Sequence, residues 1–195
     1  MKQFIIAGIA IFGLNSAIVV AETPSFNKFE VGYGVTKNGE SDVFDYDGLT
    51  LRGSYEFMDN LYVTGSYSDE TQSEKSELTD DKFEINSYSL GAGFYLPLGE
   101  SNAFYMEASY ADIEVEVDGV SQSEDGYIAT TGIRSMVTDQ LEIYGELSHL
   151  AFDTQATTLS AGTRYHFTDN LGIFAEVSRA DFDTNQYMIG ANIKF

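Results

Sequence analysis

The sequence predicts an all-β fold, a transmembrane antiparallel up-and-down β-barrel of ten strands, with eight as the alternative count. Three observations predict it. Apolar and polar residues alternate through most of the chain, short and long connections alternate between those segments, and the chain begins with an export-type segment. Thirteen Tyr, fourteen Phe and eighteen Gly among 195 residues, with only two Pro, fit a β-rich chain of one domain.

The first 21 residues, "MKQFIIAGIAIFGLNSAIVVA", differ from the rest of the chain. Lys2 is followed by an apolar run and then by small residues, the pattern of a secretory signal peptide cleaved after Ala21. A membrane-anchoring helix is the alternative, but the segment is barely long enough and no stop-transfer charges follow it. Residues 22–195 then form the barrel domain. Losing Lys2 leaves 9 basic against 31 acidic residues, a formal charge of −22.

The charge and the absence of cysteine exclude several function classes. Ten basic residues against 31 acidic ones give the whole chain a formal net charge of −21, which would repel the phosphates of nucleic acid. Without Cys the chain has no disulfide framework and no thiolate metal site, so hydrogen bonding and packing must hold the fold. We therefore expect no nucleic-acid partner, no cofactor and no bound metal.

Ten segments have the alternation of strands with one apolar and one polar face. They are residues 28–36, 47–57, 61–69, 84–96, 103–115, 127–137, 141–152, 159–167, 171–181 and 186–195. Four hairpins resemble one another in having a strand, a tight turn, a second strand and a polar exit, which is the layout of a meander.

The connections between these segments alternate in length. The short turns are "FMDNL", "LPLGESNA", "VTDQL" and "FTDNL", which are rich in turn-forming Asp, Asn and Gly. Between them lie the acidic loops "KNGESDVFD", "ETQSEKSELTDDKF" and "EVDGVSQSEDG", and two shorter connections near Asp153 and Asp183. This alternation is expected when every second turn lies on one side of a membrane.

The aromatic residues of the apolar face divide into two groups. The group toward the short turns is Phe29, Phe57, Phe94, Phe104, Phe167 and Phe195, and the group toward the long loops is Tyr67, Tyr88, Tyr110, Tyr127 and Tyr187. Two aromatic belts flanking an aliphatic band are typical of the two interfaces of a lipid bilayer. The pattern therefore predicts that the apolar face contacts lipid and the polar face lines a closed interior.

The export segment, the meander of tight turns, the acidic loops and the terminal "YMIGANIKF" resemble the small outer-membrane β-barrel proteins of Gram-negative bacteria, the OmpA/OmpX/Opa-like "porin family" group. The resemblance covers the whole mature chain and rests on a pattern, not on a signature motif. It implies export through the periplasm to the outer membrane, and a C-terminal Phe195 read by the assembly machinery. Many members have eight strands, and eight here would require the segments flanking Asp153 to be misread.

Charged residues of both signs fall on the predicted inward face. They are Glu30, Arg52, Glu56, Glu107, Arg134, Glu142, Glu146, Arg164, Glu176 and Lys194. We expect them to form a network of ion pairs across the antiparallel strands. The expected pairs are Arg164 with Glu146 and Glu176, Arg134 with Glu107 and with Glu142 or Glu146, and Arg52 with Glu30.

This network has two possible roles. It could form a charged constriction that selects ions, or it could fill the lumen and stiffen a small barrel. Barrels of about eight strands have an interior just wide enough for side chains to fill, and ten strands widen it only slightly. The sequence favours a lumen largely plugged by Arg–Glu pairs. A small porin that prefers cations is the alternative, because the inward face carries more Glu than Lys and Arg.

The two histidines raise the question of an enzyme at the barrel rim. His149 lies near the long-loop end beside Ser148, but the two side chains point to opposite faces, and parity directs His149 toward lipid or lipopolysaccharide. His166 lies inside at the short-turn end, away from any external substrate. Because hydrolysis needs a base, a carboxylate and often a nucleophile together, we predict that the protein is not an enzyme.

The acidic loops lack the residue spacing of a known calcium loop and are more typical of a solvated, self-repelling surface. We therefore predict a structural or surface-interaction role, in envelope integrity or in adhesion or defence through these loops. The expected partners are outer-membrane lipid, lipopolysaccharide and the assembly machinery. No part of the apolar face is markedly less lipophilic, so we expect a monomer.

Overall fold

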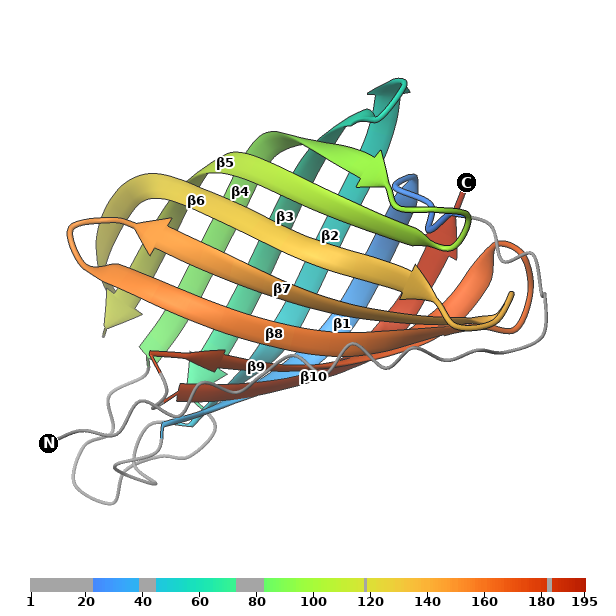
Figure 1. Cartoon of the computed structure of the whole chain (residues 1–195). Coiled ribbons are helices and arrows are strands. Elements are labelled where there is room, and N and C mark those ends of the chain that lie inside the picture. The colour runs from blue at the N-terminus through green and yellow to red at the C-terminus, as the bar shows by residue number, and fades with distance from the viewer. Residues whose placement is uncertain (1–22, 39–44, 73–82, 118, 182–183) are drawn as a thin grey trace, which may run out of the picture.

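The computed structural model describes residues 23–38, 45–72, 83–117, 119–181 and 184–195. These residues form a closed antiparallel barrel in which each strand pairs with its neighbours in sequence and the first strand pairs with the last (Figure 1). The predicted signal peptide and its cleavage site at Ala21 lie outside the described residues. Within the described ranges, no helix is long and apolar enough to cross a membrane.

The barrel has ten strands, as predicted, and not the alternative eight. Their bounds are β1 Lys28–Asn38, β2 Tyr46–Met58, β3 Leu61–Gln72, β4 Phe83–Pro97, β5 Asn102–Val117, β6 Val120–Met136, β7 Leu141–Ala151, β8 Gln155–His166, β9 Leu171–Ala180 and β10 Thr184–Lys194. The two strands flanking Asp153 are both present, and β7 pairs with β8 from Leu141 opposite Tyr165 to Ala151 opposite Gln155. The segments on either side of Asp153 were therefore not misread, as an eight-stranded barrel would have required.

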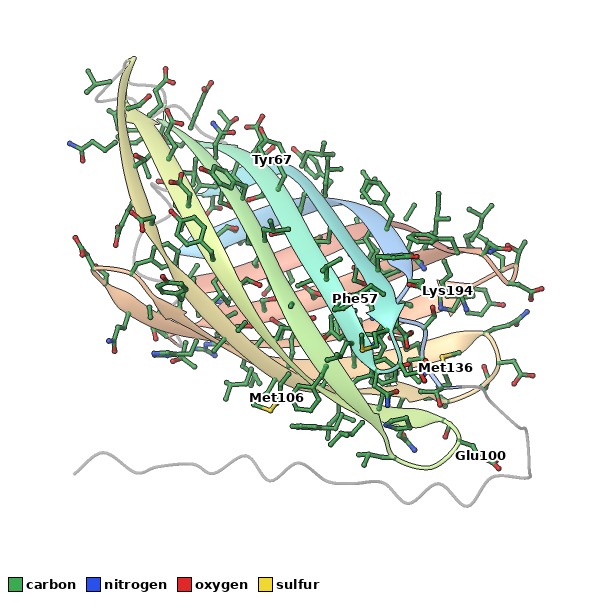
Figure 2. All side chains as sticks on the ribbon, turned by 90° about the horizontal axis from the view of Figure 1, so that it is seen from above. Phe57, Tyr67, Glu100, Met106, Met136 and Lys194 are labelled. Carbon is green, nitrogen blue, oxygen red and sulfur yellow. The ribbon has the colours of Figure 1, made fainter. Side chains whose placement is uncertain are left out.

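Two strand starts differ from the predicted ranges by four residues or more, and the others agree within two residues. β6 begins at Val120 and not at residue 127, because most of the predicted acidic loop pairs with β5 down to Val117 opposite Val120. Gly119 closes this turn with a positive φ of 80°, a conformation that glycine adopts without steric cost. Pairing of β6 with β7 starts only at Tyr127, so the β5–β6 hairpin projects beyond β7, whereas β4 pairs with β5 as far as Val117 (Figure 2). β8 likewise begins at Gln155 and not at residue 159.

The predicted division into two faces is confirmed. Apolar side chains that a soluble protein would bury are exposed on the outside of the barrel, whereas charged side chains are buried inside it. Examples of the first kind are Leu49, Leu90, Ile143, Leu171 and Ile189. Exposed apolar and buried polar side chains on the same strands are expected of a barrel that faces lipid.

The two aromatic belts lie on the outer surface as expected. Tyr67 pairs with Tyr88, and Tyr110 pairs with Tyr127, whose rings meet edge to face at 6.0 Å. At the opposite end, Phe195 stacks on Tyr55 with 6.4 Å between ring centroids. Figure 2 shows Tyr67 and Phe57 toward opposite ends of the barrel. The aliphatic band lies between these belts.

Two of the short turns share one hydrogen-bonding pattern. In the turn after β6, the Thr138 hydroxyl accepts hydrogen bonds from the backbone N–H groups of Gln140 and Leu141. In the turn after β8, the Thr168 hydroxyl accepts from Asn170 and Leu171 in the same way. The "TDxL" sequence of both turns thus supplies its own acceptor, which explains why so few residues reverse the chain there.

Candidate functional site: the barrel lumen

The lumen is lined by every second residue of each strand, so the polar positions of the alternating pattern converge on one interior space. At the short-turn end the interior is packed with aromatic and charged side chains. Toward the long-loop end it is lined by small residues and hydroxyls. The first region is densely packed, and the second contains a cavity.

The packed region is centred on Phe26, which precedes β1 and whose ring lies inside the barrel. Only 3% of its surface is exposed. Its ring stacks on Tyr95 with centroids 4.2 Å apart, contacts Tyr62 at 4.7 Å, and lies 4.5 Å from the guanidinium of Arg134. Its carbonyl accepts a hydrogen bond from the Ser54 hydroxyl at 2.6 Å. We call Phe26 with Tyr62, Tyr95 and Tyr105 the aromatic stopper, because they form the one buried apolar cluster of the described residues.

Sequence reasoning missed Phe26 because it lies outside every predicted strand. A usable signal was present, because Phe26 lies two residues before Lys28 and four before Glu30. Positions two apart share a face, and the side chains of Lys28 and Glu30 point inward. A chain that enters a strand from the periplasmic side continues the same two-residue alternation for a few positions.

The stopper is bordered by a network of buried ion pairs. Arg134 donates through Nε and Nη2 to the two carboxylate oxygens of Glu142, at 2.7 and 3.0 Å. Arg164 joins Glu142 to Glu30, with Nη1 at 2.7 Å from the first and Nε at 2.6 Å from the second. These four side chains are each at most 3% exposed. A bidentate geometry and shared carboxylates offset the cost of removing the charges from water.

Arg52 extends this network to the neighbouring wall of the lumen. Its Nη1 donates to Glu176 at 3.1 and 3.2 Å, and its Nε lies 3.7 Å from Glu30, its register partner on β1. The expected contact between Arg52 and Glu30 is therefore confirmed. Lys28 adds a further bond to Glu30 at 3.1 Å.

Three of the expected pairings are wrong. Arg164 lies opposite Glu142 on β7, not Glu146, and its ion pairs are with Glu142 and Glu30. The ion pair of Glu176 is with Arg52 and not with Arg164. The β7–β8 hairpin reverses around residue 153, whereas the expected pairing required reversal two residues later. Arg134 lies opposite Ala103 on β5, not opposite Glu107. Here too the centre of the hairpin lies two residues earlier in the chain than the expected pairing required.

The remaining predicted site residues have other partners. Glu56 accepts hydrogen bonds from the Tyr95 hydroxyl and the Asn60 backbone, both at 3.0 Å. Lys194 lies opposite Lys28 at the short-turn end. Phe195 points outward, and its backbone N–H bonds to the carbonyl of Asn27 at 3.3 Å, next to the stopper.

An aromatic residue, a glycine and a glutamate recur in line across three adjacent strands. We call these the aromatic rows: Tyr62–Gly93–Glu107, Tyr105–Gly132–Glu146 and Tyr144–Gly162–Glu176, each joined by direct register pairs. The ring covers the glycine, and the hydroxyl bonds to the glutamate at 2.8, 2.5 and 2.6 Å respectively. Glycine is required in the middle because a Cβ there would lie 2.4–2.6 Å from the ring.

The row that closes the barrel, Phe174–Gly190–Gly32, departs from this pattern. Phenylalanine has no hydroxyl, and the position of the glutamate is a glycine, so the donor and its acceptor are missing together. The guanidinium of Arg52 occupies this side, 5.4 Å from the Phe174 ring centroid. On this wall of the barrel, formed by β9, β10 and β1, the Arg52 guanidinium therefore lies against the aromatic ring and no tyrosine–glutamate hydrogen bond forms.

The aromatic rows make a stability prediction. Gly162→Ala should lower the free energy of unfolding by about 1–3 kcal/mol, because the new Cβ meets the Tyr144 ring at 2.4 Å and the carbonyl oxygen of Ala175 at 2.8 Å. Gly145→Ala is the matched control, since its Cβ points outward and meets only the Ser160 carbonyl at 3.8 Å. Urea unfolding of both variants in lipid vesicles measures the difference. Equal stability of the two would contradict the role of the glycine.

A cavity of about 220 Å³ lies next to the stopper. Its lining includes Arg134, Tyr105 and Tyr144, the carboxylates of Glu107 and Glu146, and a set of hydroxyls. The hydroxyl residues are Ser54, Thr64, Ser66, Ser89, Ser109, Thr130 and Ser148. Some of these bond to one another across strands, as Ser66 does with Ser89 at 2.7 Å and Thr130 with Ser148 at 2.8 Å.

The histidines are far from one another. His149 is exposed on the outer surface, and its Nδ1 lies 3.1 Å from the Thr157 hydroxyl. His166 is 2% exposed inside the lumen, with Asn192 at 3.5 Å from its Nδ1. Neither lies beside a carboxylate in an arrangement suited to hydrolysis within the described residues.

The fold and the lumen define an outer-membrane β-barrel, and sequence comparison places the chain within a family of that class. The profile described as "Outer membrane protein beta-barrel domain" matches residues 4–195, so the chain belongs to this family. Its proteins are found in the outer membrane of Gram-negative bacteria, and the short turns accordingly lie on the periplasmic side. No curated protein matches the chain.

Solved structures are similar to the chain in fold alone. The NanC porin matches 86% of this chain and 100% of its own, with a TM-score of 0.54 at 10% identity. The translocator domain of the autotransporter NalP from Neisseria meningitidis matches 88% of this chain and 89% of its own, with a TM-score of 0.52 at 11% identity. The KdgM porin matches 85% and 99%, with a TM-score of 0.48 at 14% identity.

Proposed function

We propose that the protein is a structural and surface-interaction barrel of the outer membrane, with no enzymatic activity and with its lumen closed to solutes. The observation that carries this proposal is the stopper: Phe26, itself 3% exposed, packs inside the lumen between tyrosine rings and Arg134. A closed lumen leaves the outer surface and the extracellular loops as the functional parts.

The projecting β5–β6 hairpin supports a role at the cell surface. Above the tyrosine belt it carries Asp112, Glu114, Glu116, Glu124 and Asp125. Asp112 and Asp125 face each other across the two strands. Like charges in direct opposition weaken a hairpin, so their presence favours a role in contact with a partner over a role in folding. Adhesion and defence are both compatible with such a surface.

The partners we propose follow from the outer surface of the barrel. The aromatic belts and the aliphatic band contact outer-membrane lipid and lipopolysaccharide. The terminal Phe195, exposed on the outer surface, serves the assembly machinery as its recognition signal. The protein works as a monomer, because its apolar face continues around the barrel.

A small cation-preferring pore is the second candidate, and one observation favours it. Glu107 and Glu146 both line the cavity, and each is bonded only to a tyrosine hydroxyl among the described residues. These carboxylates would attract cations if the lumen opened to the periplasm.

Single-channel recording in a planar bilayer separates the two candidates. We expect the refolded protein to give no opening steps at neutral pH and moderate salt, because the stopper and the ion pairs fill the lumen. Altered gel mobility before boiling shows that the recorded protein is folded. Uniform steps with cation selectivity would instead support the pore and remove the proposal of a closed lumen.

A further inference from the structure

The cavity beside the stopper is accessible to water from the outer side. Inward-facing side chains at the level of Ser66, Ser68 and Ser87 are partly exposed, and an inward-facing side chain can be exposed only to the lumen. At the level of the stopper, by contrast, Tyr62 is 0% and Glu30 1% exposed. The cavity is thus a pocket closed at its periplasmic end and reached from outside the cell.

The hydrogen-bonding groups of the cavity wall are not all used within the protein. Arg134 is 3% exposed, and its Nη1 has no hydrogen-bond partner among the described residues. Glu107 and Glu146 each accept one bond from a tyrosine and have no ion pair with the described residues. A carboxylate can accept several hydrogen bonds, so both glutamates have acceptor capacity left for a ligand or water in the cavity.

The charges around the cavity nearly cancel. Four cations, Lys28, Arg52, Arg134 and Arg164, stand against five carboxylates, Glu30, Glu107, Glu142, Glu146 and Glu176, a formal balance of −1. Such a site has no strong field for an anion or a multivalent cation. It does present donors, acceptors and several hydroxyls within one space.

We propose that this cavity binds one neutral polyhydroxylated solute of about monosaccharide size, taken up from the outer side. A hydroxyl group has one donor and also accepts, so a solute with several hydroxyls can donate to Glu107 with one and to Glu146 with another, and can exchange hydrogen bonds with the serine and threonine hydroxyls of the wall. The volume of about 220 Å³ equals that of roughly seven water molecules in the liquid, enough for one such solute. The rings of Tyr105 and Tyr144 supply apolar surface for its carbon atoms. This inference goes beyond the proposed surface role and does not require the lumen to conduct.

The test uses the refolded full-length barrel in detergent micelles, with sorbitol as the neutral probe and gluconate as its carboxylate analogue. We expect sorbitol to shift the amide NMR signals of Thr130 and Ser148 in a saturable way, with gluconate binding more weakly. Glu146→Gln should weaken sorbitol binding roughly tenfold, the effect of removing one hydrogen bond to a charged group.

Glu70→Gln is the matched control, because Glu70 is also an inward carboxylate but does not line the cavity and bonds to Gln186 at 3.1 Å. It should leave sorbitol binding unchanged. Both variants are first shown to be folded by gel mobility. If Glu146→Gln fails to fold, Thr130→Val replaces it, with the same weakening expected. Three results would each overturn the proposal. The first is no saturable shift with sorbitol, the second is equal sorbitol affinity of the cavity variant and the control, and the third is tighter binding of gluconate than of sorbitol.

Discussion

Replacing Glu142 with alanine should lower the free energy of unfolding by about 3–5 kcal/mol, the cost of leaving a buried charge without its partner. Glu142 is 1% exposed and bonds to both Arg134 and Arg164. Arg164 keeps its bond to Glu30 in the variant, whereas Arg134 has no other carboxylate within ion-pair distance among the described residues. Urea unfolding in lipid vesicles, followed by gel mobility, measures the loss.

A double replacement distinguishes a buried charge from a lost contact. In Arg134→Met/Glu142→Met both charges are removed and apolar volume replaces them, so stability should recover most of what Glu142→Ala loses. Glu100→Ala, at an exposed carboxylate in a periplasmic turn, should change stability by less than about 0.5 kcal/mol. The stability lost by the double variant is compared with the sum of the losses in Arg134→Met and in Glu142→Met. If the two are equal, the network does not stabilise the barrel through charge pairing.

The sequence predicted the fold because every strand of this barrel contacts two different media. Lipid outside and polar groups inside impose a strict period of two, visible at positions such as Leu171 and Ile173 against Phe174 and Glu176. The outer part of the β5–β6 hairpin, from Val120 to Gly126, escaped prediction for the same reason. Above the membrane both of its faces meet water, so "SQSEDG" needs no apolar alternation to be a strand.

The lumen was predicted in composition but not in geometry. Which residues point inward follows from parity, and the inward charges were found in that way. Which of them meet depends on register, and a shift of two residues in the centre of a hairpin moved Arg164 from Glu146 to Glu142. The aromatic rows were missed because Tyr62, Gly93 and Glu107 are neighbours only once three strands are aligned.

Phe26→Ala should change the bilayer recording from silence to uniform opening steps. The ring fills the space between Tyr62, Tyr95 and Arg134, and without it the outer cavity is joined to the periplasmic mouth. The variant should also lose about 3–5 kcal/mol of stability, as large-to-small replacements in packed cores do. Steps that favour cations would indicate that Glu107 and Glu146, both on the cavity wall, dominate the opened path.

Two controls separate loss of the stopper from general loosening of the barrel. Phe26→Leu keeps an apolar side chain in the stopper and should remain silent, because Ser54 still holds the backbone carbonyl of residue 26. Phe29→Ala removes an aromatic ring of the outer belt, which is 42% exposed, and should also remain silent while losing stability. Conductance in the Phe29 variant would show that general loosening of the barrel opens the lumen. Silence in a folded Phe26→Ala barrel would show that the ion pairs around Glu142 close the lumen without the aromatic ring. The closed state would then depend on charge pairing alone, and opening it would require breaking the contacts of Arg134 and Arg164.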